Sequence, residues 1–167
     1  MEYGFVKVAS AVPTVKVADC RHNAWQMAEM IADAANQNVE IIIFPELSIT
    51  GYTCGDLFAQ SVLLEEAEKS LEWLVAETQS LPVISIVGIP HPHNGSLINA
   101  AVVFQSGKIL GVVPKTFLPN YKEFYEKRWF ASSLQTPECV TSICGQRVPM
   151  QRDMLFATGN TTFGVEI

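Results

Sequence analysis

A short apolar run closed by a proline, Glu40-Ile41-Ile42-Ile43-Phe44-Pro45, decides the fold class of this chain. Apolar residues in a row without alternation are typical of a strand that is covered on both faces, and Pro45 cannot donate to a strand ladder. Upstream, apolar spacings of three and four predict a helix over Asn23–Ala35, capped by Asp19. The apolar stripe of this helix consists of Trp25, Ala28, Ile31, Ala32 and Ala35. A β-branched run at Val6–Val12 predicts a preceding strand, so the chain begins as strand, helix, strand.

The same kinds of element continue downstream. Residues Glu65–Gln79 predict a second helix, whose glutamates form a solvated face. The apolar run Val83–Gly88, bounded by prolines on both sides, predicts another buried strand. Residues Ala100–Gln105 and Lys108–Val113 predict a hairpin that turns at Ser106-Gly107. Helices that alternate with strands, together with a central hairpin, favour a layered α/β domain.

The composition and the apolar pattern of the sequence change after Val113. Residues Pro114–Ser133 hold prolines, basic residues and aromatics without a period of two or 3.6, which predicts a long, shaped, functional loop. Strands are expected again near Met154–Ala157 and at Thr161–Ile167. The chain stops within the second of these, which looks like a core strand, and we therefore expect residues 1–167 to be a fragment of a larger domain.

Composition narrows the classes of function. The 167 residues include 17 Asp and Glu against 11 Lys and Arg, a formal net charge of −6. No basic cluster suited to phosphates or to an anionic membrane is present. No apolar run approaches the roughly 20 residues of a membrane span, and the amino terminus lacks the pattern of a secretion signal. We therefore expect a cytoplasmic protein that binds neither nucleic acid nor membrane.

Two groups of potential metal ligands are better explained without a metal. The four cysteines are scattered, with no zinc or redox spacing, and are expected to be reduced thiols. The segment His91-Pro92-His93 has no third histidine and no nearby carboxylate, and its prolines are typical of a turn. We predict no metal in this domain.

Two charged residues at predicted strand ends are the best candidates for chemistry. Glu46 follows the run Ile41–Phe44, and Lys115 follows the strand Lys108–Val113. Either residue alone is most often a solvated surface charge. Ligand sites of open α/β folds lie at the carboxyl ends of strands. If the two meet there in a partly buried pocket, the carboxylate could serve as a general base and the ammonium could stabilise an oxyanion.

The surroundings of these two residues resemble a known family. Phe44-Pro45-Glu46-Leu47-Ser48-Ile49-Thr50-Gly51-Tyr52 resembles the glutamate motif of the nitrilase, or carbon–nitrogen hydrolase, superfamily. The segment from Pro114 to Phe130 resembles its lysine motif. With Gly51–Leu57, Asn120-Tyr121 and Glu123–Glu126 included, the chain is most similar to the glutaminase domains of glutamine-dependent NAD+ synthetases. The resemblance covers Val6 to Ile167.

The resemblance implies a four-layer αββα sandwich, incomplete here at its carboxyl end, and a Glu-Lys-Cys triad. Glu46 and Lys115 match the first two members. The third is a cysteine that, in relatives, follows the strand matching Phe163–Ile167, so this chain stops one residue short of it. The same resemblance makes Tyr121, Tyr52, Phe124 and Glu126 candidates for binding substrate. Other interpretations of these residues remain open: Tyr121 could be an aromatic loop anchor, and Glu126 could pair on the surface with Lys122, Lys127 or Arg128, while Arg128 could pair with a carboxylate.

By resemblance, the parent enzyme would hydrolyse L-glutamine and pass ammonia to a synthetase domain that amidates deamido-NAD+ with ATP and Mg. That synthetase domain and its Ser-Gly-Gly-x-Asp-Ser loop are absent from residues 1–167. No cofactor is expected in this domain, a homo-oligomer is expected, and the fragment itself should be inactive. Relatives usually read Val-Pro-Phe-Gly where this chain has Val148-Pro149-Met150-Gln151, so an altered turn is expected at Pro149–Arg152.

Two other functions remain open. One is a stand-alone amidase of the same superfamily that acts on another carbon–nitrogen bond. The other is a non-catalytic interaction module that uses its uncovered apolar surface for assembly.

Overall fold

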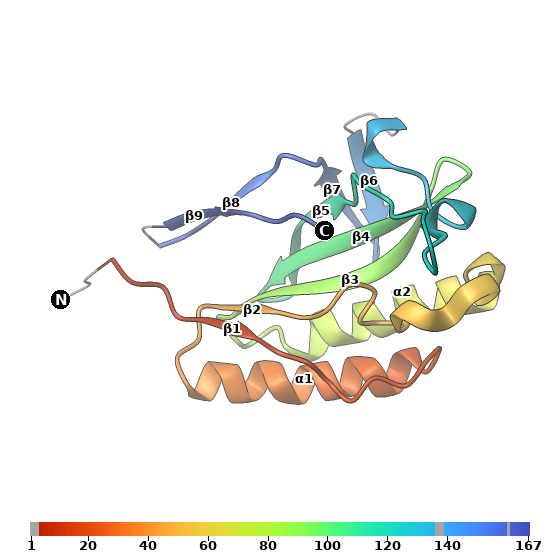
Figure 1. The fold of residues 1–167 in the computed structure, drawn as a ribbon. Helices are drawn as coiled ribbons and strands as arrows, with labels where there is room; N and C mark the ends of the chain where they lie inside the picture. The colour runs from red at the N-terminus through yellow and green to blue at the C-terminus, as the bar shows by residue number, and fades with distance from the viewer. Residues whose placement is uncertain (1–3, 136–138, 160) are drawn as a thin grey trace.

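The computed structural model describes residues 4–135, 139–159 and 161–167. Two helices, α1 (Cys20–Asn36) and α2 (Ser61–Glu77), lie on one face of a seven-stranded sheet (Figure 1). The strands of this sheet are β1 (Val8–Ser10), β2 (Ile41–Ile43), β3 (Ile84–His93), β4 (Ser96–Gln105), β5 (Lys108–Pro114), β6 (Cys139–Ile143) and β7 (Gln146–Met150). A separate antiparallel pair, β8 (Leu155–Thr158) and β9 (Thr161–Gly164), lies on the other face. Three short 3-10 segments are η1 (Tyr52–Ala59), η2 (Glu126–Arg128) and η3 (Ser133–Gln135).

The order of strands in the large sheet determines which loops meet. The order is β1-β2-β3-β4-β5-β7-β6. Strands β1, β2 and β3 run parallel, whereas β4 runs antiparallel to both β3 and β5. Strand β5 therefore runs in the same direction as β2, from which β3 and β4 separate it in the sheet. The segments that follow β2 and β5 consequently begin at the same end of the sheet, where the carboxyl ends of both strands lie.

The sheet is packed on both faces. Towards the helices, Ile42, Val87 and Val102 of the sheet share one core with Ile31 of α1 and Leu71 of α2. On the opposite face a smaller core, which includes Ile41, Ile84, Val103 and Phe156, joins the sheet to β8 and β9. The predicted layered α/β fold is therefore confirmed. The described residues form a helical layer, a seven-stranded sheet and a second sheet of two strands.

Helix α1 confirms the predicted helix and its Asp19 cap, but its buried face differs from the predicted stripe. The Asp19 side chain accepts from the His22 amide, as an N-cap does. The buried positions are Cys20, Asn23, Ala24, Met27, Ala28, Ile31 and Ala34. Ala28 and Ile31 of the predicted stripe are buried and Ala35 packs against the core, but Trp25 is 48% exposed, so the predicted stripe was wrong at Trp25. The spacing of apolar residues included Trp25 in the predicted buried face. In the structure Ala24 and Met27 are buried in the core instead.

Strand β3 runs through both of its prolines, so the predicted end before Pro90 and the turn at His91-Pro92-His93 were wrong. Pro90 and Pro92 lie opposite Asn99 and Leu97 of β4. The other neighbour, β2, has its last register partner at Ile86. Beyond Ile86, Gly88 still bonds to Ile49 and Ser48 of the turn after β2, but Pro90 and Pro92 have no register partner in β2, so a proline without an N–H leaves no ladder bond to β2 unmade there.

The hairpin of β6 and β7 was not predicted. Its turn is Cys144-Gly145, and the predicted turn at Pro149–Arg152 was misplaced because Pro149 and Met150 belong to β7. Pro149 is tolerated on the exposed side of the strand, between buried Val148 and buried Met150. The chain turns at 152–153 instead.

Two strands predicted as fully covered are covered only in part. In β2, Ile41 and Ile42 are buried but Ile43 is 36% exposed. In β9 half-buried and exposed residues alternate, as in the edge of a two-stranded sheet rather than a core strand. The β8–β9 pair packs over Ile41 and buries its side chain, whereas the side chain of Ile43 stays partly exposed to solvent.

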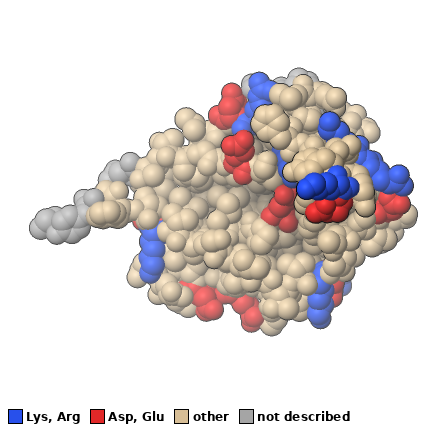
Figure 2. Space-filling model, in the orientation of Figure 1, with Lys and Arg blue, Asp and Glu red and all other residues tan. Residues whose placement is uncertain are grey.

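The charge distribution separates two parts of the surface. In the view of Figure 2, Lys, Arg, Asp and Glu gather over the side of the molecule that carries the loop after β5, while the area over β2, β8 and β9 is mostly uncharged. Across the described ranges, neither helix has the length and apolarity that crossing a membrane requires.

Candidate active site

Glu46 is positioned by a tight turn at the end of β2. The Phe44 amide donates to the Ile86 carbonyl at 2.9 Å, and the Gly51 amide closes the turn on the Leu47 carbonyl at 2.7 Å. Leu47 has a φ of +52°. Gly88 of β3 lies directly beneath the turn, where a Cβ would collide with the Leu47 nitrogen. The turn that presents Glu46 therefore depends on a neighbouring strand without a side chain at this point.

Lys115 is positioned by the end of β5. Its amide donates to the Asn99 carbonyl of β4 at 2.8 Å, and its carbonyl accepts from the Ser133 amide at 3.0 Å. Its ammonium Nζ lies 2.6 Å from Glu46 Oε1. The two residues predicted to meet at the strand ends therefore do so. Lys115 is 5% exposed, and the Glu46 side chain keeps 29% of its surface open.

Glu126 is the second carboxylate on Lys115. Its Oε2 lies 2.9 Å and its Oε1 3.0 Å from Lys115 Nζ. Glu126 is 2% exposed, so the alternative that it pairs on the surface with Lys122, Lys127 or Arg128 was wrong. The backbone of η2 holds it in place, because the Glu126 amide donates to the Pro119 carbonyl and its carbonyl accepts from the Phe130 amide. Because a buried carboxylate is costly unless a charged group compensates it, the ion pair with Lys115 is what allows Glu126 to be buried.

Tyr52 supports Glu126. Its hydroxyl donates to Glu126 Oε1 at 2.7 Å. Burial and this hydrogen bond both raise the pKa of the Tyr52 phenol, because ionisation would place a second negative charge beside the carboxylate. Tyr52 therefore remains a neutral donor to Glu126, a contact that the sequence analysis did not predict, and the binding of substrate by Tyr52 stays a prediction.

Asn99 belongs to the same cluster, although the sequence analysis missed it. Its side-chain amide donates to Glu46 Oε1, the oxygen that also faces Lys115. Asn99 is fully buried in β4, between Ile98 and Ala100. A single amide side chain inside the otherwise apolar run Leu97–Phe104 was the available signal.

Tyr121 and Phe124 lie on the exposed rim of the loop. Their rings form an edge-to-face pair with centroids 5.8 Å apart. Tyr121 is 64% exposed and Phe124 is half-buried. For the described residues, the structure gives neither side chain a hydrogen bond to Glu46, Lys115 or Glu126. Their predicted contact with substrate remains a prediction.

Arg128 anchors the loop from outside, as expected. Its Nε and Nη2 donate to the two oxygens of Asp56 at 2.8 and 3.1 Å, and Trp129 Nε1 donates to the same carboxylate at 3.0 Å. These hydrogen bonds from Arg128 and Trp129 lower the pKa of Asp56 to about 2. The clamp joins the loop after β5 to η1, the segment that begins with Tyr52.

The cavity beside Glu46 has a volume of about 220 Å³. Glu46, Asn99 and Gly88 line it, and so do the last residues of the chain, Val165–Ile167. The end of the chain therefore lies next to the carboxylate, although it is 121 positions away in sequence.

The cysteines of the chain lie elsewhere. All four are free thiols. Burial is the main cause that raises the pKa of Cys20 and Cys144 to about 12, and burial also raises that of Cys54. Cys144 occupies the β6–β7 turn, and Cys139 lies 3.5 Å from His93 Nε2. None of them contacts Glu46 or Lys115 in the described structure.

His91 is buried at the far end of β3. Its Nε2 lies 2.8 Å from Thr141 Oγ1. Burial, reinforced by neighbouring His93, lowers the pKa of His91 to about 4, so the ring is neutral at pH 7. The described residues contain no group of three or more metal-ligating side chains.

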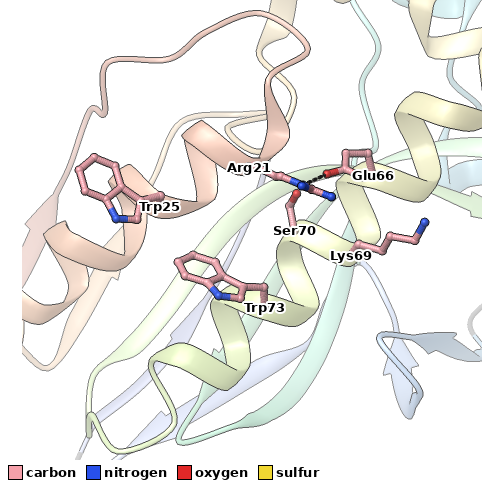
Figure 3. A pocket seen from close by; sticks show the side chains of 6 residues that line it. All are labelled: Arg21, Trp25, Glu66, Lys69, Ser70 and Trp73. Carbon is pink, nitrogen blue, oxygen red and sulfur yellow. Dashed lines mark hydrogen bonds and ion pairs between the residues drawn. The ribbon is translucent and has the colours of Figure 1, made fainter.

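A second hollow lies between α1 and α2. It has a volume of about 450 Å³ and is lined by Arg21, Trp25, Glu66, Lys69, Ser70 and Trp73 (Figure 3). Arg21 and Glu66 form an ion pair at one end, and the two tryptophans, 48% and 41% exposed, stand at the other. We call this hollow the α1–α2 groove.

Fold and site together define a class: a layered α/β protein with a partly buried carboxylate–lysine–carboxylate cluster at the carboxyl ends of its strands. Residues 7–167 match the carbon-nitrogen hydrolase family, and the chain belongs to that family.

Its relatives are longer proteins. The glutamine-dependent NAD(+) synthetase of Mycobacterium bovis is 35% identical over 95% of this chain, which covers 23% of that protein. The enzyme of the same name from Aquifex aeolicus is 39% identical over 68% of the chain and 20% of its own length. The chain thus spans about a quarter of the length of the curated relatives it matches.

Solved structures agree with the fold. A glutamine-dependent NAD(+) synthetase from Cytophaga hutchinsonii superposes with a TM-score of 0.86 at 27% identity, over 95% of this chain and 27% of that one. An amidase from Nesterenkonia sp. superposes with a TM-score of 0.65 at 21% identity, over 86% of this chain and 54% of that one. At that identity the amidase supports the fold alone.

Proposed function

We propose that residues 1–167 are the N-terminal part of a glutamine-hydrolysing domain in a glutamine-dependent NAD+ synthetase. The observation that carries the proposal is the convergence of Glu46, from the turn after β2, with Lys115 and Glu126, from the segment after β5, in one partly buried cluster. The names of the relatives point to glutamine as the nitrogen source. In this proposal the ammonia is used elsewhere in the parent to amidate deamido-NAD+ with ATP and Mg.

The nucleophile in this proposal is a cysteine directly after Ile167 in the parent. The position is supported by the cavity that Ile167 and Glu46 share. Amide nitrogen is a poor leaving group, and a thioester intermediate replaces one difficult step with two easier ones. Residues 1–167 alone would then be inactive, because they lack the thiol to be acylated.

Glu46 acts as the general base and acid. The carboxylate takes the proton from the thiol as sulfur attacks the carboxamide carbon, and it returns that proton to the departing nitrogen. The partly open side chain of Glu46 suits this role, since 29% of its surface still faces the cavity while its partner Lys115 is buried.

Lys115 faces the developing oxyanion. Its ammonium is desolvated and held by two carboxylates, so it needs no reorganisation when negative charge appears on the substrate oxygen. A donor of this kind contributes about 3 kcal/mol to stabilising a transition state. Glu126 and Tyr52 position this lysine, and Tyr121 and Phe124 contact glutamine at the rim.

The proposal extends to the whole parent protein in two further respects. We infer from the resemblance that the parent is cytoplasmic and that it assembles as a homo-oligomer.

The test compares two nitrogen sources in the full-length protein. Glu46→Gln and Lys115→Met should lower glutamine-driven NAD+ formation by about 10²–10⁴-fold, the range for a positioned acid–base group, and should leave ammonia-driven formation intact. Arg21→Ala, in the α1–α2 groove, is the matched charge-removing control and should leave both activities unchanged. Glutamine-driven activity that survives in either site variant would overturn the proposal.

A further inference from the structure

The two oxygens of Glu46 have different surroundings. Oε1 accepts from both Lys115 Nζ, at 2.6 Å, and the side-chain amide of Asn99. Among the described residues, Oε2 has no hydrogen-bond partner, and the exposed part of the side chain borders the cavity that Ile167 lines. A carboxylate with two donors on one oxygen cannot turn about its last torsion without breaking both bonds.

We infer that Asn99 is a positioning residue that makes Oε2 the reactive oxygen of Glu46. The inference rests on the proposed function, in which Glu46 is the base. Lys115 alone could follow the carboxylate as it turns, because an ammonium on a flexible stem is a point charge with rotating donors. The amide of Asn99 is planar and is carried by a buried strand, so its direction is defined.

The requirements of the fold do not explain an asparagine at this position. Asn99 is fully buried, and its Oδ1 has no hydrogen-bond partner among the described residues. A buried polar atom without a partner destabilises a fold, and an apolar side chain of similar size would remove the penalty. The contact with Glu46 is the one hydrogen bond that the Asn99 side chain makes in the described structure.

Asn23 provides the contrast. It is also fully buried, but all of its polar atoms are used within the fold. Its Oδ1 accepts from the Lys16 amide at 2.8 Å, and its Nδ2 donates to the carbonyls of Lys16 and Ile49. Asn23 is thus a structural asparagine that joins α1 to the turn after β2, whereas Asn99 is directed at a reactive group.

With Asn99 in place, the proton has a defined route. The S–H bond of the attacking thiol breaks as an Oε2–H bond forms. The sulfur electron pair forms the bond to the carboxamide carbon while the C=O π pair moves to the oxygen, which becomes the oxyanion that Lys115 faces. When the tetrahedral adduct collapses, this pair re-forms the C=O bond of a thioester, the C–N pair leaves with the nitrogen, and the same proton moves from Oε2 to that nitrogen, which departs as ammonia. Lys115 retains its proton throughout.

The experiment uses Asn99→Leu and Asn99→Asp in the full-length protein. Leucine removes both polar ends at similar volume, so thermal stability should be unchanged or higher. Glutamine-driven kcat should fall at least about tenfold, a part of the contribution of a positioned base, with little change in KM. The acidic limb of the kcat profile should move to higher pH, because the ionised carboxylate has lost a donor. Asn99→Asp should move it further in the same direction, because a second negative charge faces Glu46.

Asn23→Leu is the matched control. It should lower the thermal midpoint, because it leaves backbone groups of Lys16 and Ile49 without partners, and it should leave the pH profile of the folded protein unchanged. An unchanged kcat and pH profile in both Asn99 variants, with an active wild type, would overturn the role of Asn99 and leave the proposed function standing. A wild type that forms NAD+ from ammonia but not from glutamine would overturn both.

Discussion

The strand-end site and the α1–α2 groove are both hollows that contain an ion pair, yet they differ in how their charges are held. At the strand ends, Lys115 is 5% and Glu126 2% exposed, and Lys115 meets Glu46 although the two are 69 positions apart in sequence. In the groove, the Arg21 side chain is 82% exposed and pairs with Glu66 across the surfaces of two helices. The groove is the larger hollow. Burial and convergence of charge, rather than the size of a hollow, distinguish the site that can do acid–base chemistry.

The largest effect is expected from removing the buried cation. Lys115→Met leaves Glu46 and Glu126 facing each other without compensation, and breaking a buried ion pair in this way costs about 3–5 kcal/mol. Urea unfolding at pH 7 measures the loss. Adding Glu126→Gln to Lys115→Met should recover part of it, because the uncompensated charge is then removed. A loss as small as that of a surface pair would mean that the cluster is solvated.

The next effect concerns the backbone beneath Glu46. Gly88→Ala would place a methyl group against the Leu47 nitrogen, a collision that only backbone movement can relieve. We expect a loss of about 1–3 kcal/mol, as for overpacking, and a misplaced Glu46. Gly164→Ala is the matched control, since the nearest atom to its Cβ would be a Leu155 methyl at 3.8 Å. Equal unfolding midpoints for the two variants would contradict the proposed packing.

His91 is a buried titratable residue outside both hollows. Unlike Lys115 in the strand-end site, it has no opposite charge to compensate it, so a different pH dependence is expected. The pKa of His91 is lowered to about 4, against an ordinary value of 6.5, so the unfolded chain takes up a proton between these pH values before the folded one does. Stability is therefore unaffected by His91 above about pH 6.5 and is lost progressively as pH falls towards 4.

Between pH 7 and pH 5 this linkage amounts to about 2 kcal/mol, at 1.36 kcal/mol per pKa unit. Urea unfolding of His91→Gln should show a correspondingly smaller acid loss than wild type. Parallel pH dependence in wild type and His91→Gln would show that His91 titrates normally.

The smallest effect is expected in the groove. Arg21→Ala should lower the free energy of unfolding by about 0.2–1 kcal/mol, the range for exposed ion pairs. Even this loss should vanish in high salt, because solvent-exposed charges are screened. Thermal midpoints at low and high salt measure it. A loss comparable to that of Lys115→Met would remove the distinction between the two regions.

Local patterns predicted much of the fold. The apolar run around Ile42 identified a buried strand, Asp19 identified the start of α1, and Ser106-Gly107 identified the hairpin of β4 and β5. The ends of elements were less predictable. A proline interrupts a strand only where its missing N–H would have bonded to a neighbouring strand. At Pro90 this depends on where the neighbouring strand β2 ends, which the local sequence does not show. The hairpin of β6 and β7 has too few apolar residues for its pattern to show.

Some residues of the candidate site could likewise be predicted from the sequence, and others could not. Glu46 and Lys115 could be selected because each follows a recognisable strand, and the resemblance to a family added Glu126 and Tyr52. Asn99 could not be selected, since its significance lies in the direction of its amide towards Glu46. The rotation of α1, which leaves Trp25 half-exposed, also depends on packing against α2 rather than on spacing.

The sequence by itself determined the kinds of element, the residue types available for acid–base chemistry and the family to which the chain belongs, because these depend on short-range patterns. Only the tertiary structure decided that three charges share one buried site, that one oxygen of Glu46 is held and the other open, and that the end of the chain lies beside it. These properties depend on the parallel direction of β2 and β5 across the sheet, and long-range strand pairing is not encoded in any local period.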